Sequence, residues 1–352
     1  MSDIMTCMPF GQLMEWVLQE KSGKDTVFGV HRPYTINADH NLTIFERNLE
    51  TPVGPAAGPH TQLAQNIIAS YYAGARFFEL KTVQKMDGAE LSACVNKPCI
   101  LADDEGYNCE WSTELTVPDA MSEYIKAWFI LHVMAKEFNL GAQDGFQFNI
   151  SVGYDLEGIK GDKVNTFIDG MMEAKDTAVF QECKKWLLDN ADRFHNFTRE
   201  DIEAIPSNVC NSATISTLHG CPPQEIESIA NYLLTEKHLN TFVKCNPTLL
   251  GYDFARKTMD EMGYDYMVFG DFHFRDDLQY EDAVPMLTRL MKLSEELGLE
   301  FGVKITNTFP VDVTRNELPS EEMYMSGKSL FPLSISLAAK LSEEFAGKLR
   351  IS

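Results

Sequence analysis

The chain has 352 residues, of which 44% are hydrophobic and 23% are charged, as in an ordinary soluble enzyme. Its 30 basic and 52 acidic residues give a formal net charge of −22, which repels phosphate backbones and anionic membranes and so argues against nucleic-acid or membrane partners. Residues 1–20 lack the apolar core of a signal peptide, and no stretch reaches the roughly 18 apolar residues that span a bilayer. We therefore expect a cytoplasmic protein.

Short apolar runs alternate with breaks rich in Gly, Pro and Asn and with helical stripes. Residues 1–50 are expected to form a helical or extended lead-in, and residues 51–352 a single barrel domain. The runs are apolar on both faces, which is typical of parallel strands buried on two sides. The expected strands are 51–54, 76–83, 146–153, 213–218, 241–245, 266–270, 301–306 and 348–352.

Helical patterns separate these runs. Long helices are predicted over 118–138 and 163–194, within insertions at about 90–140 and 155–210. Another is predicted from Pro222–Pro223 onward, because proline and acidic residues favour a helix N-terminus. About eight strands alternating with helices indicate the α/β class and a (β/α)8 TIM-type barrel with helical insertions.

The eight cysteines contain no CxxC pair, so neither a zinc ribbon nor a ferredoxin-type cluster is expected, and no metal site is predicted. In the absence of an export signal they are expected to be reduced thiols.

In a barrel of this kind, reactive residues collect at the C-terminal ends of the strands. Three lysines end predicted strands there: Lys81, Lys244 and Lys304. A lysine inside the mouth of a barrel needs a partner, for which a bound anion or an electron-rich ring is suited; the alternative is a side chain that reaches out to solvent. Other polar residues at strand ends are Thr82, Asn149, Asn307 and Thr308.

Cys221 lies just before a predicted helix N-terminus, where the helix dipole favours the thiolate, so it could move a proton to or from a substrate carbon. The alternative is a small buried thiol. His219, two residues earlier, is either a pocket residue or a hydrogen-bonded loop residue.

Two loops could also contact a ligand. Ala56, Ala57 and Gly58 follow the first predicted strand, and such small residues allow a flat ligand to lie against the backbone. Asn108 and Glu110 could bind a cyclic amide, because an amide and a carboxylate offer complementary donors and acceptors. The alternative for this second loop is a solvated surface.

Several segments resemble a known family over essentially the whole chain. The segments TPVGPAAGPHTQLAQNI, FFELKTVQ, STLHGCPPQEIE, FVKCNPTLLGY and MYMSGKSLFPLS are similar to the N-terminal barrel of a family of iron–sulfur flavoproteins named for a selenate reductase subunit. The barrel of that family is similar to dihydroorotate and dihydropyrimidine dehydrogenases. Those dehydrogenases continue past the segment that matches 349–352 into a glycine-rich turn and a final strand, so the resemblance implies a barrel truncated before its last strand or strands. The resemblance implies FMN in the barrel, with 4Fe–4S clusters and an FAD/NAD(P)H module in domains that this chain does not contain.

The resemblance also implies roles for single residues. Ala56, Ala57 and Gly58 match the turn that lies against the flavin, and Lys81 and Thr82 match a flavin-contacting Lys-Thr pair; Asn149 is assigned to the cofactor as well. Either Lys244 or Lys304 matches a further flavin lysine, with Lys244 preferred. The substrate is assigned to Asn108, Glu110, His219, Asn307 and Thr308.

The dehydrogenase motif Asn-Leu-Ser-Cys-Pro aligns with residues 218–222, which implies that Cys221 is the catalytic acid or base. Leu218 and Gly220 replace the Asn and the Ser of that motif, which argues against a pyrimidine substrate. Three hypotheses follow. The first is a flavin-dependent oxidoreductase that receives electrons from iron–sulfur and flavin domains or reductase subunits and acts on a small molecule. The second is a pyrimidine or dihydroorotate dehydrogenase, and the third is a non-catalytic scaffold barrel.

Overall fold

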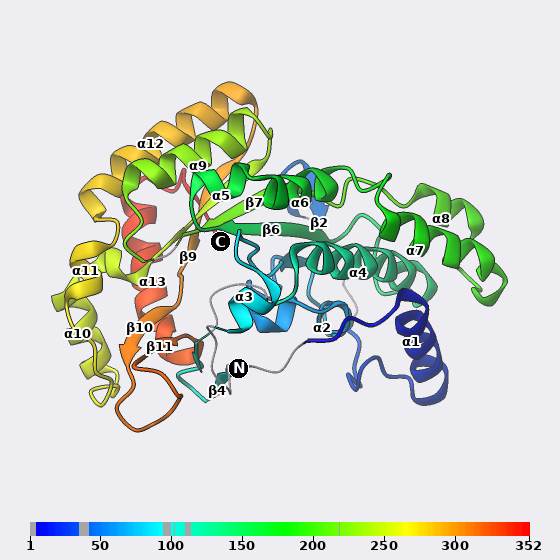
Figure 1. Cartoon of the computed structure of the whole chain (residues 1–352), viewed down its shortest axis with the longest axis horizontal. Helices are drawn as coiled ribbons and strands as arrows, with labels where there is room; N and C mark the ends of the chain where they lie inside the picture. Colours follow the sequence, from blue (N-terminus) through cyan, green and yellow to red (C-terminus); the bar gives the residue numbers. More distant parts are fainter. Residues whose placement is uncertain (1–4, 35–41, 94–99, 102, 110–113, 218) are drawn as a thin grey trace.

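The computed structural model describes residues 5–34, 42–93, 100–101, 103–109, 114–217 and 219–352. Their centre is a curled sheet of parallel strands (Figure 1). Within the described residues the order across this sheet is β12 (Arg350–Ile351), β9 (Phe301–Ile305), β8 (Asn240–Cys245), β7 (Cys210–Ser216), β6 (Gln147–Gly153) and β3 (Phe77–Glu79). Every neighbouring pair is parallel, so the α/β class and the partial barrel of the sequence analysis are confirmed.

Helices cover the outer face of the sheet. Figure 1 shows α9 and α12 along one side, with α10, α11 and a small second sheet at one end and α1, α7 and α8 at the other. The longer helices are α1 (Phe10–Lys24), α2 (Ala64–Tyr72), α4 (Val117–Glu137), α6 (Asp162–Met172), α7 (Ala178–Asp189), α9 (Pro223–Thr235), α10 (Tyr252–Glu261), α12 (Tyr280–Leu297) and α13 (Gly327–Glu344). The shorter ones are α3 (Gly88–Ser92), α5 (Leu156–Lys160), α8 (Arg199–Ala204) and α11 (Phe272–Asp276), with 3-10 turns η1 (Pro59–Thr61), η2 (Ala191–Arg193) and η3 (Pro247–Leu250). Among the residues that the structure describes, no helix is both long enough and apolar enough to cross a bilayer.

The two faces of the sheet differ in polarity. Outward side chains such as Phe148, Ile150 and Val303 are buried in the main apolar core. The side chains that alternate with them along the strands are mostly polar, among them Glu79, Asn149 and Thr214. The expectation of strands apolar on both faces is therefore wrong, because the barrel interior beside the site is built from polar residues.

A hairpin of β1 (Leu42–Ile44) and β2 (Arg47–Leu49) closes the amino-terminal end of the sheet. Its Phe45 is buried against Phe77 and Phe242, and the backbone oxygen of Phe45 accepts a hydrogen bond from Asn211 at the start of β7. Gln147 at the start of β6 donates to backbone oxygens of the same hairpin. These contacts block one end, so the open end of the sheet is the carboxyl-terminal one.

Two predicted strands are not strands. Residues 51–54 are extended and lie beside β3, where the Val53 oxygen accepts hydrogen bonds from the N–H groups of Arg76 and Phe77. Pro52 and Pro55 have no N–H to return, so no ladder forms. Residues 266–270 are irregular, and their apolar character has another cause.

That cause is a second, smaller core. The run 266–270 is apolar because Met267 and Phe269 are buried in it. This core lies at the small sheet, whose strand order is β10 (Phe309–Asp312), β11 (Glu322–Met325), β5 (Tyr107–Asn108) and β4 (Ile100–Leu101).

Candidate functional site

A cavity of about 890 Å³ opens at the carboxyl ends of the parallel strands. This is the end at which barrels of this class place their active sites. The strands, the loop before η1, the small sheet and α13 all contribute side chains. Predicted site residues that line it are Ala56, Ala57, Gly58, Lys81, Thr82, Asn108, His219, Lys244, Asn307 and Thr308.

Small residues form one wall of the cavity. The extended segment 51–55 delivers Ala56, Ala57 and Gly58 to the mouth, and its position is set by the hydrogen bond from the Glu79 N–H to the Pro55 oxygen, 3.1 Å long. A Cβ on Gly54 would lie 1.5 Å from the Phe77 carbonyl oxygen, so only glycine permits this approach. The wall therefore presents backbone and methyl groups rather than bulky side chains.

Two lysines and one carboxylate lie at the floor of the cavity. Lys244 Nζ is 3.0 Å from Glu79 Oε1, and Lys304 Nζ is 2.7 Å from Glu79 Oε2. Lys244 and Lys304 are register partners on β8 and β9, and both line the cavity. Their positions therefore do not distinguish which of the two matches the flavin lysine of the resemblance. One carboxylate facing two ammonium groups leaves one net positive charge.

Burial governs the titration of these lysines. It lowers the pKa of Lys244 and of Lys304 to about 8, whereas the Glu79 carboxylate at ion-pair distance favours their charged forms. Glu79 itself is fully buried. Sequence reasoning missed it, although a carboxylate within the apolar run Phe77-Phe78-Glu79-Leu80 is a signal, because a buried carboxylate needs a cationic partner.

Further polar side chains lie near the floor, and Asn149 is the register partner of Glu79. Lys81 and Thr82 are buried and line the cavity, and Thr82 Oγ1 is 2.7 Å from Ser151 Oγ. Asn149 lies inside the barrel but not on the cavity wall; it donates to Thr214 Oγ1 at 2.7 Å, and its Oδ1 has no hydrogen-bond partner among the described residues. A buried acceptor without a partner is a position where a ligand or a water fits.

The rim of the cavity carries amide groups. Asn108 donates to the backbone oxygen of Tyr324 at 3.4 Å, and the backbone N–H of Asn307 donates to the Cys245 oxygen at 2.8 Å. Thr308 follows directly, its N–H bonded to Asn307 Oδ1. Glu110, the predicted partner of Asn108, lies outside the described residues.

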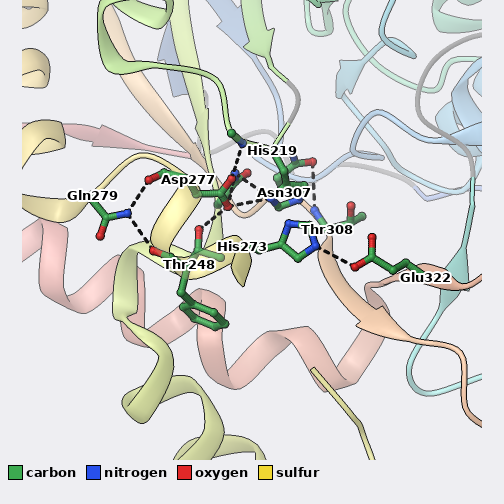
Figure 2. A network of polar contacts seen from close by, with 11 residues as sticks. His219, Thr248, His273, Asp277, Gln279, Asn307, Thr308 and Glu322 are labelled. Atoms are coloured by element: carbon green, nitrogen blue, oxygen red, sulfur yellow. Dashed lines mark hydrogen bonds and ion pairs between the residues drawn. The ribbon is translucent and has the colours of Figure 1, made fainter. Parts of the chain in front are cut away.

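His219 belongs to a network that joins the loop before α9 to the segment between α11 and α12 (Figure 2). Its Nδ1 is 2.7 Å from Asp277 Oδ2, and Asp277 also accepts from the Gly220 N–H, Thr248 Oγ1 and Asn246 Nδ2. Sequence reasoning missed Asp277 and Thr248, since no local pattern links positions 29 to 58 residues apart.

Cys221 is not among the residues that line the cavity. It is half-buried, packs against the main core, and has its Sγ near the Pro222 oxygen. Burial raises the pKa of its thiol to about 11, and the neighbouring carboxylates of Glu225, Asp155 and Asp277 act in the same direction. The helix-dipole effect expected from sequence is therefore outweighed by desolvation and negative charge.

Comparison with known proteins supplies the context of this cavity. Residues 28–352 match the family model described as "Oxidoreductase YgfK, N-terminal TIM-barrel domain". The chain is 47% identical over 366 residues to proteins named "Putative oxidoreductase YgfK" from Escherichia coli K12 and from Escherichia coli O157:H7, an alignment that covers 100% of this chain and 35% of each relative. The chain thus spans about a third of the length of these curated relatives.

Solved structures show a more distant similarity. The structure of DHODH from Eimeria tenella in complex with ferulenol is 15% identical at a TM-score of 0.47, covering 98% of this chain and 79% of that one. A likeness at this level carries no argument about function.

Proposed function

The chain belongs to the family of oxidoreductase YgfK N-terminal TIM-barrel domains, and we propose that its cavity binds FMN and carries out the flavin-dependent step of a larger oxidoreductase. The observation that carries this proposal is the pairing of a wall of small residues with a floor of net positive charge. A flat ring fits against Ala56, Ala57 and Gly58. The two lysines at Glu79 favour an electron-rich ring on which negative charge accumulates.

The described residues fit such a group in size as well as in chemistry. A volume of about 890 Å³ lies within the range of roughly 300–1,000 Å³ that is usual for small-molecule and cofactor sites. Lys81, Thr82, Lys244 and Lys304 line the cavity and are the proposed contacts. Asn149 does not line the cavity, so it is not among them. Bound FMN would supply hydride transfer, while the protein binds and orients the reactants and excludes water.

The rest of the protein is proposed to supply the electrons. This chain spans about a third of the relatives' length, which leaves room for the 4Fe–4S clusters and the FAD/NAD(P)H module that the sequence resemblance implies. The proposal extends to a cytoplasmic location and to contacts with those domains or with reductase subunits. We propose selenate as a candidate electron acceptor, because the family that the sequence resembles is named for a selenate reductase subunit.

A second candidate function is a pyrimidine or dihydroorotate dehydrogenase. Asn108, Asn307 and Thr308 all line the cavity, and amide and hydroxyl groups can bind the ring amides of a pyrimidine. Leu218 and Gly220, which replace the matching Asn and Ser, weigh against it. The third candidate, a scaffold barrel, predicts a pocket filled by side chains, and the large open cavity supports the flavin proposal instead.

Titration of the full-length protein with FMN tests the proposal. We expect saturable binding with flavin absorbance bands, and a Lys81→Ala variant with roughly tenfold weaker affinity, about 1.4 kcal/mol. Lys85→Ala is the matched control, because Lys85 is exposed, is paired with Asp155 and does not line the cavity. A folded protein that binds no FMN would favour the scaffold reading, and equal affinity in the Lys81 variant would remove that residue from the site.

A further inference from the structure

The ring of His219 has one nitrogen held and one nitrogen free for a ligand. Nδ1 faces Asp277, while Nε2 is buried and has no hydrogen-bond partner among the described residues. His219 lines the cavity. When Nδ1 carries the hydrogen that Asp277 accepts, the neutral ring presents Nε2 as a proton acceptor and the charged ring presents it as a donor.

Asp277 is fixed more firmly than a surface carboxylate. It is 3% exposed and accepts from four groups: His219, the Gly220 N–H, Thr248 and Asn246. Burial by itself would raise its pKa, but the hydrogen bond and charge of His219, with the bonds from Thr248 and Gly220, lower it. Asp277 therefore stays ionised and holds one tautomer and one orientation of the imidazole.

Titratable groups surround the ring from each neighbouring element. Asp277 and Asp276 lie at the end of α11, and His273 on α11 contacts the ring edge-on at 5.3 Å and is itself paired with Glu322 of β11. Tyr324 of β11 stacks on the ring at 6.1 Å with an interplanar angle of 8°. The ring is thus enclosed on several sides, and His219 is one of the residues that line the cavity.

We propose that His219, oriented by Asp277, exchanges the substrate's proton in this cavity, in place of Cys221. The inferred substrate class is a small molecule with a carbon–carbon double bond conjugated to an electron-withdrawing group, or its saturated form. The proposal rests on the flavin function above for the source of hydride.

The step balances in both directions. A hydride, which bound reduced FMN would supply, would add to one carbon; the π-electron pair would move to the neighbouring carbon, and that carbon would take the proton from Nε2 of the imidazolium. In the reverse direction neutral Nε2 would remove the proton, and the hydride would leave to oxidised FMN. The net positive charge at Glu79, Lys244 and Lys304 stabilises the carbanion between the two transfers.

A preformed carbanion tests the proton transfer without any flavin step. Propane-2-nitronate already carries the electron pair that hydride delivery would create, and its absorbance disappears on protonation. We expect the full-length protein to accelerate this protonation above the buffer rate and His219→Gln to slow it by on the order of 100-fold.

Three further variants separate His219 from its surroundings. His273→Gln is the matched control and should retain the acceleration, because His273 does not line the cavity. Cys221→Ala should retain it as well. Asp277→Asn should lose most of it and change the pH profile, because an amide no longer selects the Nδ1–H tautomer.

Several results would overturn the proposal. These are no acceleration by the wild-type protein, equal rates in the wild type and His219→Gln, or loss of acceleration in Cys221→Ala alone. Nitrogen NMR of labelled histidine in the wild-type protein gives a second measurement that needs no variant to fold, and a hydrogen on Nε2 of neutral His219 would contradict the assignment. Failure of FMN binding would leave these readouts intact, so the two proposals fail separately.

Discussion

Single residues at the site act through partners that are far away in sequence. Glu79 follows two phenylalanines in β3, and its burial is compensated by lysines on β8 and β9. His219 depends in the same way on Asp277, 58 positions later. The lysines and His219 could be selected from sequence because they follow apolar strands. Their partners could not, because distant charges meet only when the strands assemble.

Cys221 illustrates how the surroundings reverse a local expectation. With its thiol pKa raised to about 11, only about one molecule in a thousand carries the thiolate at pH 8, roughly 100-fold fewer than for a thiol of pKa 9. Alkylation of Cys221 by iodoacetamide in the native protein should be slow at pH 8 and should accelerate about tenfold per pH unit up to about pH 11.

Mass spectrometry of the Cys221 peptide measures this rate, with the urea-unfolded protein as the control. Rapid alkylation of the native protein at pH 7 would show an activated thiolate and would restore Cys221 as the leading acid or base.

Helices lie where the sequence predicted them when their capping residues and apolar spacing are contained in the helical segment and its immediate neighbours. The predicted helices at 118–138 and after Pro222 correspond to α4 and α9, because capping and apolar spacing are encoded nearby. The segment 51–55 behaves differently, since its prolines allow it to accept hydrogen bonds from β3 but not to return them. It acts as an anchor for the Ala56–Gly58 wall rather than as a strand.

Gly54→Ala should disrupt this anchor. The added Cβ would lie 1.5 Å from the Phe77 oxygen, so the backbone must separate, at a cost of about 3 kcal/mol. Urea unfolding measures the loss, and FMN affinity should fall with it. Gly270→Ala is the control, because nothing lies within 4 Å of a Cβ at that position. Equal stability of the two variants would mean that segment 51–55 is not held against β3.

The whole molecule places its polar groups inside the barrel and its apolar groups between sheet and helices. The hairpin β1–β2 closes the amino-terminal end of the sheet, and the cavity with Glu79, Lys244 and Lys304 lies at the carboxyl-terminal end. Holding two lysines in such an interior has a consequence for the stability of the entire fold.

That consequence is a pH dependence of the free energy of unfolding. The pKa of Lys244 is about 8 in the folded state against 10.5 in the unfolded chain, so between these values the unfolded state binds more protons. Stability therefore rises with pH across this window, by up to about 1.4 kcal/mol per unit of pKa displacement. Below pH 8 the lysine is charged in both the folded and the unfolded state, and its burial then lowers the free energy of unfolding by the full amount.

Urea unfolding of the wild type and of Lys244→Met between pH 7 and 10 measures the contribution of Lys244 as the difference in free energy of unfolding between the two proteins. The buried thiol of Cys245, whose pKa is raised, lowers stability as the pH rises, but it does so in both proteins and cancels in the difference. The wild type should gain stability relative to the variant as the pH rises. A constant difference would mean that Lys244 keeps its ordinary pKa.

The sequence by itself determined the alternation of strands and helices, the barrel class and the strand ends at which Lys81, Lys244, His219 and Asn307 lie, because these depend on periodicity and on neighbouring residues. The tertiary structure alone decided that Glu79 neutralises one of two lysines, that Asp277 orients His219 and that Cys221 is removed from the cavity wall. Charges and hydrogen bonds act over a few ångströms in space, and the residues that provide them here come from separate strands and loops.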